Sequence, residues 1–156
     1  NPAGVRKTML GVFDKSFVPK IAEALKINES TSALVVSSRE HMDEVSISDI
    51  TYAARVDAQG IREFEIDPLE YGIKRAPLEA IVGGDAKQNA QILYNIFNNR
   101  AQDAQRDIVL INAACSLMVE GMARDIQDGL EIANEAILSQ KARHKLEEII
   151  RVSAKL

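Results

Sequence analysis

The chain has 156 residues, of which 46% are hydrophobic and 27% are charged, and its formal net charge is −4. This length suits one domain with its own hydrophobic core, and the acidic balance does not favour a nucleic-acid or anionic-membrane surface. The longest apolar run without a charge, residues 108–119, is shorter than the ~20 residues of a membrane span. The single Cys115 lies among apolar neighbours, which indicates a buried thiol without an internal disulfide.

The first part of the chain predicts a βαβ unit. Residues 1–4 indicate a turn, because they combine proline and glycine, and the apolar residues 8–13 indicate a strand. Asp14 or Ser16 can cap the next helix, whose apolar residues recur at helical spacing: Phe17, Val18, Ile21, Ala24 and Leu25. The uninterrupted apolar run at residues 33–36, which is rich in β-branched side chains, is typical of a parallel strand buried on both faces. A right-handed crossover is therefore expected.

Two adjacent carboxylates follow that second strand. Asp43 and Glu44 lie in the polar segment after residues 33–36, and ligands of open α/β sheets bind beyond the carboxyl ends of the strands. Magnesium takes one or two protein carboxylates and fills its other positions with water and substrate phosphates. An Asp-Glu pair in a loop is more often simply solvated, so from these residues alone both interpretations stay open.

The middle of the chain predicts an antiparallel hairpin at the edge of the sheet. Residues 51–56 and 61–66 read as strands, and the turn-forming residues 57–60, Asp-Ala-Gln-Gly, connect them. Asp67 followed by Pro68 then predicts a single helical turn, which ends at Gly72.

The Gly83-Gly84-Asp85 segment opens a helix with Asp85 as its cap. Its predicted buried stripe consists of Ala90, Ile92, Leu93, Ile96 and Phe97. Asn89 lies on the same stripe, where it is either an internal hydrogen-bonding strut or a ligand contact, and the strut is favoured. The two glycines could hold a phosphate on free amides, but a tight turn is the more common role.

The last part of the chain predicts three helices. Asp107 begins the most apolar one, residues 108–119, which we expect to be central and buried. The side-chain amide of Asn112 is expected to form its hydrogen bonds within the protein. Gly121 is expected to separate this helix from the next one. Two further helices have their apolar residues at Ile126, Leu130, Ala133 and Ile137, and at Ala142, Leu146, Ile149 and Ile150. Because Gln140 gives no stop signal at their joint, one bent helix is also possible. The expected fold class is α/β, a partly parallel sheet with an antiparallel hairpin, flanked by helices.

The order of these motifs resembles the anthranilate phosphoribosyltransferase family. The matching segments are Asn1-Pro2-Ala3, Leu10-Gly11-Val12, Ala33-Leu34-Val35-Val36, Asp43-Glu44-Val45-Ser46, Arg75-Ala76-Pro77-Leu78, Gly83-Gly84-Asp85, Asn89-Ala90, Arg106-Asp107-Ile108-Val109-Leu110 and Asn112-Ala113-Ala114. The resemblance spans residues 1–156 but only about the second half of the family's chain. It implies one α/β domain fragment, the C-terminal part of a nucleoside phosphorylase-like large domain. Gln140 departs from a glycine common in the family.

The resemblance implies transfer of phosphoribosyl from phosphoribosyl pyrophosphate to anthranilate, in cytoplasmic tryptophan biosynthesis. It assigns Mg²⁺ to Asp43 and Glu44, as metal ligands and not proton shuttles, and it places the substrate-binding residues upstream of Asn1. It also implies a homodimer that forms through an absent helical domain, and a fragment that is inactive alone. The alternatives are a nucleoside phosphorylase-like enzyme and a non-catalytic nucleic-acid or protein-binding relative, although no nucleic-acid or membrane partner is expected.

Overall fold

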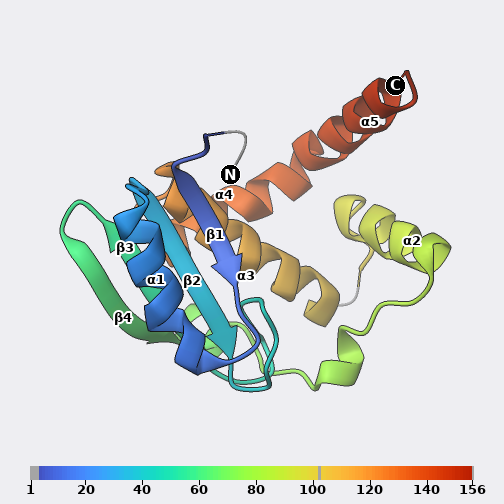
Figure 1. Ribbon diagram of the computed structural model, residues 1–156. Coiled ribbons are helices and arrows are strands. Elements are labelled where there is room, and N and C mark those ends of the chain that lie inside the picture. The colour runs from blue at the N-terminus through green and yellow to red at the C-terminus, as the bar shows by residue number, and fades with distance from the viewer. Residues whose placement is uncertain (1–3, 102, 156) are drawn as a thin grey trace.

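A mixed four-stranded sheet organises the chain in the computed structural model, which describes residues 4–101 and 103–155 (Figure 1). The strands β1 (Lys7–Gly11), β2 (Ser32–Ser38), β3 (Thr51–Asp57) and β4 (Gly60–Ile66) lie side by side in sequence order. Of the turn predicted at residues 1–4, the segment 1–3 lies outside the described residues. Gly4 has a φ of 64°.

The predicted βαβ unit is confirmed. β1 and β2 pair in parallel, with Lys7 opposite Ser32, and the helix α1 (Val18–Ile27) connects them. The predicted strand at residues 8–13 extends too far, because the Val12 N–H makes a last bond to the Val36 carbonyl at 2.9 Å before the chain turns away. The chain then enters a short 3₁₀ turn, η1 (Lys15–Phe17), which the Asp14 side chain caps.

The predicted edge hairpin is also confirmed. β3 pairs antiparallel with both β2 and β4, so that β4 is an edge strand. The predicted helical turn follows as the 3₁₀ helix η2 (Pro68–Tyr71), with Asp67 as its cap. It ends at Gly72, whose φ of 73° lies in the left-handed region that glycine adopts without steric cost. A second 3₁₀ turn, η3 (Leu78–Ala80), was not predicted.

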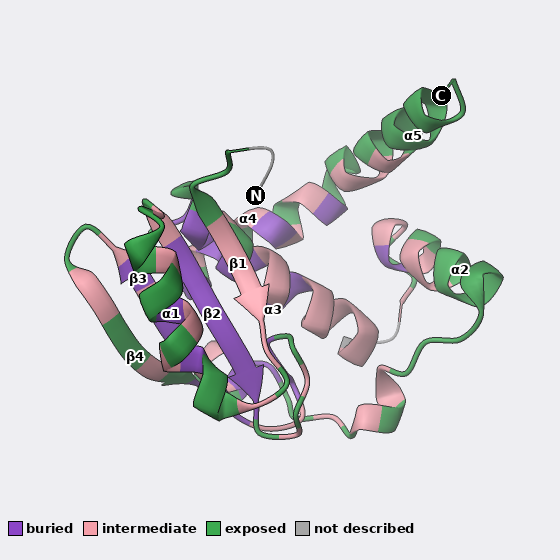
Figure 2. Cartoon of the chain, viewed as in Figure 1, coloured by how far each residue is buried: buried purple, intermediate pink, exposed green. Residues whose placement is uncertain are grey.

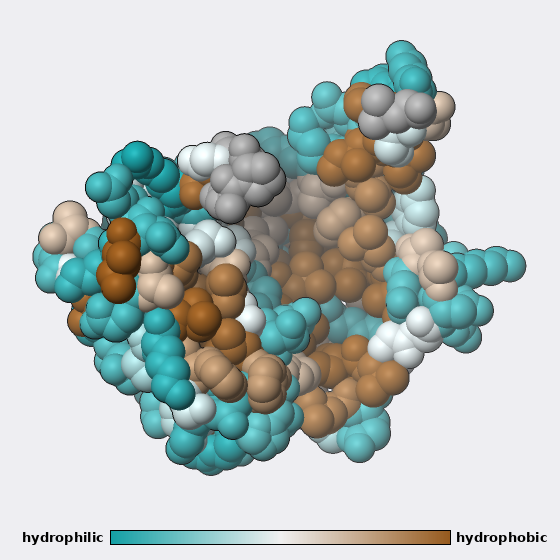
Figure 3. All heavy atoms as spheres, in the orientation of Figure 1, coloured by the Kyte–Doolittle hydropathy of each residue, from teal (hydrophilic) through white to brown (hydrophobic). Residues whose placement is uncertain are grey.

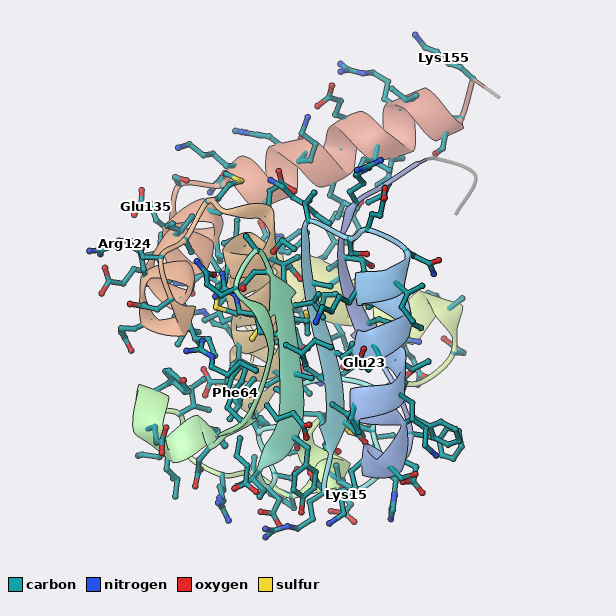
Figure 4. All side chains as sticks on the ribbon, turned by 60° about the vertical axis from the view of Figure 1, so that its left-hand side comes forward. Lys15, Glu23, Phe64, Arg124, Glu135 and Lys155 are labelled. Carbon is teal, nitrogen blue, oxygen red and sulfur yellow. The ribbon has the colours of Figure 1, made fainter. Side chains whose placement is uncertain are left out.

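Helices cover both faces of the sheet. On one face, α1 contributes to a cluster of small and β-branched residues: Val18, Ala22, Ala33, Val35, Ala54 and Val56. On the other face, α3 (Asp103–Glu120) packs against the larger cluster, which includes Leu34, Val36, Ala53, Ile111, Ala114, Cys115 and Met118. Figure 4 shows the two sides, with Glu23 on α1 and Phe64 on the α3 side. Alternate β2 residues thus enter opposite layers, as expected for a strand buried on both faces.

Three helices accompany α3 in the second half of the chain. They are α2 (Ala86–Phe97), α4 (Ile126–Leu138) and α5 (Lys141–Ser153). The prediction that Asp107 begins the apolar helix is wrong, because α3 already starts four residues earlier at Asp103. The last two helices are separate: Gln140, with a φ of 62°, adopts the left-handed conformation between them.

The burial predicted for α2 and α3 is only partly correct. Of the predicted α2 stripe only Ile96 is buried, and Ala90 is exposed (Figure 2). In α3, the flank formed by Val109, Ala113 and Leu117 is only partly buried: it packs against a smaller apolar cluster of α2, α3 and α4 and also lines a hollow of about 870 Å³ between α3, α4 and α5. Figure 3 shows this hollow as a concave apolar surface. None of the described helices is long and apolar enough to cross a membrane.

We predict that Leu34→Ala lowers the free energy of unfolding by about 2–5 kcal/mol, because Leu34 is fully buried between the sheet and α3. Urea unfolding followed by circular dichroism measures this change. The matched control is Leu138→Ala, because Leu138 is 52% exposed and its truncation should cost less than about 1 kcal/mol. An equal decrease in the free energy of unfolding of the two variants would show that Leu34 is not part of the hydrophobic core.

Candidate functional site

The acid-bearing loop, residues 39–50, connects β2 to β3. Its Asp43 and Glu44 are exposed, whereas the next three residues, Val45, Ser46 and Ile47, are buried. Because β1 and β2 are parallel, they end at the same edge of the sheet, and the loop lies over that edge. The two acids therefore lie beyond the carboxyl ends of two parallel strands, which is the position that open α/β sheets use for ligands.

Neither carboxylate is committed to a partner. Among residues 4–101 and 103–155, no side chain or backbone group forms a hydrogen bond or ion pair with the Asp43 or Glu44 carboxylate. Both residues line a hollow of about 390 Å³ with an apolar floor, and Asp43 also lines one of about 280 Å³ beside Gly11. Two negative side chains with accessible oxygens are thus available to a cation from solvent.

Polar side chains of the flanking strands fix both ends of the acid-bearing loop. At the β2 end, the Ser38 hydroxyl accepts a bond from the Met42 N–H at 2.9 Å, and the Met42 carbonyl accepts one from the Ser38 N–H at 3.0 Å. At the β3 end, the Thr51 hydroxyl accepts a bond from the Ser46 N–H at 2.9 Å. Ser46 in turn donates to Glu40. The loop is therefore held by a local hydrogen-bond network.

Asn112 of α3 holds the middle of the loop. Its side-chain oxygen accepts a bond from the Val45 N–H at 2.9 Å, and its side-chain nitrogen donates to the Val45 carbonyl at 2.8 Å. The same nitrogen donates to the Ile108 carbonyl at 2.9 Å. The expectation that Asn112 is satisfied internally is therefore confirmed. Its partner, Val45, lies 67 positions away and is not evident from the sequence.

Gly11 lets the loop approach the end of β1. A Cβ atom at this position would lie 1.5 Å from the Asp43 carbonyl oxygen and 2.8 Å from its Cα. Non-bonded atoms cannot approach so closely, so any side chain here would displace the backbone of the first acid. The glycine of the Leu10-Gly11-Val12 segment is therefore required by the position of the loop.

A chain of ion pairs, not predicted from the sequence, lies near the base of the loop. Arg39 contacts Asp49 at 3.1 Å, and Arg75 contacts Asp49 at 3.5 Å and Asp67 at 3.0 Å. The Ile50 N–H, aided by the two guanidinium groups, lowers the pKa of Asp49 below its usual value. These arginines are thus already paired with carboxylates.

The Gly83-Gly84-Asp85 segment is held by side chains of α2, but the tight turn favoured for its two glycines is absent, because neither glycine lies in a turn or has a positive φ. The Gly84 N–H donates to the Asn89 side-chain oxygen at 2.8 Å, and the Asn89 amide donates to the Gly84 carbonyl at 3.0 Å. Asp85 and Gln88 form a reciprocal capping box. Asn89 is therefore a strut, although it is exposed on α2 and not on a buried stripe.

The chemistry of the acid-bearing loop fits a hard divalent cation. The described part of the chain has no group of three or more His, Cys, Asp or Glu side chains that could enclose a metal ion. Two adjacent carboxylates are, however, the usual protein share for Mg²⁺, which takes its remaining ligands from water and phosphates. Cys115 is no alternative nucleophile, because burial raises the pKa of its thiol to about 12.

We predict that Gly11→Ala loosens the acid-bearing loop and lowers the free energy of unfolding by about 1–3 kcal/mol, because the new methyl group overlaps the Asp43 carbonyl. Hydrogen–deuterium exchange of residues 39–50 and urea unfolding measure the two effects. Thr8→Ala, on the same strand, is the control. An unchanged exchange rate in the Gly11 variant would show that the close approach is not required.

Comparison with known proteins gives one family. A family model described as "Glycosyl transferase family, a/b domain" matches residues 1–143. The anthranilate phosphoribosyltransferases of Rubrobacter xylanophilus and Xanthobacter autotrophicus are 37% and 42% identical to the whole chain over 156 residues. The chain spans only 46% and 45% of their respective lengths.

Solved structures show the same fold. The anthranilate phosphoribosyltransferase of Thermus thermophilus is 30% identical, with a TM-score of 0.85 over 95% of this chain and 43% of that one. The Saccharomyces cerevisiae enzyme, in complex with PRPP and Mg, has the same TM-score and coverage at 24% identity. Since the family model matches nearly the whole sequence, the chain belongs to the glycosyl transferase family defined by this α/β domain.

Proposed function

We propose that residues 1–156 form the C-terminal part of the α/β domain of an anthranilate phosphoribosyltransferase. That enzyme transfers phosphoribosyl from phosphoribosyl pyrophosphate to the amine of anthranilate and releases pyrophosphate, in cytoplasmic tryptophan biosynthesis. The relatives with this name, which are 37% and 42% identical over the whole chain, support the assignment. The observation that supports it most directly is the pair of uncommitted carboxylates, Asp43 and Glu44, at the ends of the parallel strands.

The acid pair is proposed to bind Mg²⁺ together with the pyrophosphate group of the substrate. When bound, Mg²⁺ offsets the negative charge that develops on the departing pyrophosphate. Asp43 and Glu44 need a cation for this role, since two bare carboxylates would repel the substrate. The complex of the yeast relative with PRPP and Mg is consistent with this proposal.

The residues of this chain contribute position and charge. Asp43 and Glu44 supply oxygen ligands and no proton transfer, because their role is to hold the cation at the leaving group. The bonds from Asn112 and Ser38 fix the loop before any ligand arrives, so less ordering is needed on binding. We also propose that homodimerisation and anthranilate binding depend on the part of the relatives' length that residues 1–156 do not cover.

We predict that Asp43→Asn in the complete enzyme lowers kcat/KM by at least ~10-fold, a loss of about 1.4 kcal/mol of transition-state stabilisation. The Mg²⁺ concentration needed for half-maximal activity should rise, because the amide is a weaker ligand than a carboxylate. Steady-state assays across a Mg²⁺ titration measure both effects. Glu23→Gln, a neutralised exposed acid on α1, is the matched control and should keep wild-type kinetics (Figure 4).

The same assays distinguish the other functions. Unchanged kinetics of the Asp43 variant across the Mg²⁺ titration would show that Asp43 is not a metal ligand. Phosphate-dependent cleavage of a nucleoside, without turnover of phosphoribosyl pyrophosphate, would instead indicate a nucleoside phosphorylase-like enzyme. Salt-dependent binding to nucleic acid without any turnover would indicate a non-catalytic relative.

We predict that the 156-residue chain alone has no measurable transferase activity, because it spans only about 45% of its relatives and the proposed site needs walls from the remainder. The check is formation of phosphoribosyl anthranilate by purified chain, with the complete enzyme as a parallel control. Turnover by the isolated chain, with no contaminating host enzyme, would show that these residues form a whole site.

A further inference from the structure

Asn112 is the only large polar residue in the apolar stretch of α3 at residues 108–119, and all of its described amide bonds are directed to backbone. Two of the three bonds are made to the N–H and the carbonyl of Val45. This reciprocal pair resembles the contact between two residues of adjacent antiparallel strands, and it fixes both the position and the tilt of one peptide segment. Val45 directly follows Glu44.

The helix that presents Asn112 is held firmly. Its neighbours Ile111, Ala114 and Cys115 are buried against the sheet, with exposed fractions of 0%. The bond from the Asn112 amide to the Ile108 carbonyl, one turn earlier on α3, orients the side chain. The Val45 segment is therefore connected to the core of the molecule through a side chain whose own rotamer is fixed.

We propose that Asn112 is a positioning residue for the acid pair: by holding the backbone of Val45, it keeps the Glu44 and Asp43 carboxylates aimed beyond the strand ends. The inference rests on the proposed metal site. The Ser38 and Met42 bonds hold the loop before the acids, and the Asn112 bonds hold it directly after them. Loss of the Asn112 bonds leaves the bond between the Ser46 N–H and Thr51, one residue further from the acids, as the hydrogen bond that holds this side of the loop.

The test uses the complete protein, with Mn²⁺ as a probe and pyrophosphate present. Electron paramagnetic resonance measures the concentration of free Mn²⁺, from which the dissociation constant follows. Asn112→Leu keeps the side-chain volume but makes none of the three bonds, and we expect the Mn²⁺ dissociation constant to rise about 5- to 10-fold. Hydrogen–deuterium exchange at residues 42–45 should accelerate. Asn112→Ala, which leaves room for water, is the second variant if Asn112→Leu does not fold.

Ile111→Val is the matched control, because it removes one methyl group from the sheet-facing side of the same helix and leaves the bonds between Asn112 and Val45 intact. Its Mn²⁺ dissociation constant should stay within about 2-fold of wild type. Saturating Mg²⁺ should restore kcat in the Asn112 variants, because displaced metal ligands lower only the affinity for the metal. General misfolding would lower the fraction of active enzyme, which added Mg²⁺ cannot restore.

The outcomes separate the two proposals. If Asp43→Asn weakens Mn²⁺ binding but the Asn112 variants match Ile111→Val, the positioning role is wrong and the metal site stands. If the Asn112 variants weaken Mn²⁺ binding but wild type transfers no phosphoribosyl to anthranilate, the positioning role stands and the proposed function fails. Wild-type protein that binds no Mn²⁺ even with pyrophosphate overturns both.

Discussion

The candidate site depends on how a short loop is held so that its two carboxylates remain without partners among the described residues. Exposed acids are ordinary, but acids fixed in one place require a rigid backbone beneath them. Here the backbone is fixed from three directions: Ser38 on β2, Thr51 on β3 and Asn112 on α3. Each such hydrogen bond contributes only about 0.5–1.5 kcal/mol to stability, so rigidity comes from their number and their different origins.

The loop can take this position only because of a small residue on the neighbouring strand. The Asp43 backbone lies directly against Gly11, where any Cβ would overlap it. The parallel pairing of β1 and β2 brings these two segments together, since it places both strand ends at one edge. The βαβ topology is therefore a direct cause of the site geometry as well as its support.

The sequence predicted the features that local patterns encode. The uninterrupted apolar run at residues 33–36 indicated a strand buried on both faces, and Asp67 before Pro68 indicated a capped turn. Both signals depend only on residues close in the sequence. The start of α3 was misplaced because Asp107 resembles a helix cap, although three helix-compatible residues precede it at positions 104–106. The α2 stripe was overestimated, since periodicity shows which face is apolar but not whether anything packs on it.

The anchors of the candidate site could not be predicted in the same way. Asn112 was recognised as a polar residue that needs a partner, but nothing in a single sequence connects it to Val45, 67 positions earlier. The partner follows from the docking of α3 on the sheet, which is set by the apolar cluster around Ile111 and Leu34. The close contact of Gly11 with Asp43 is likewise a consequence of tertiary packing.

The small number of protein ligands has a consequence for the proposed chemistry. The described residues supply two adjacent acids and no third His, Cys, Asp or Glu in a cluster, so a divalent cation held there would draw most of its ligands from water and from a diphosphate. Its affinity for the loop would then depend on the diphosphate, and by thermodynamic linkage the diphosphate would bind more tightly with the cation present, by the same factor. A site of this kind favours the metal–diphosphate pair over either species alone. The rigid loop raises the affinity of the site, because carboxylates fixed in advance leave the ordering of the ligands as the main entropic cost of binding.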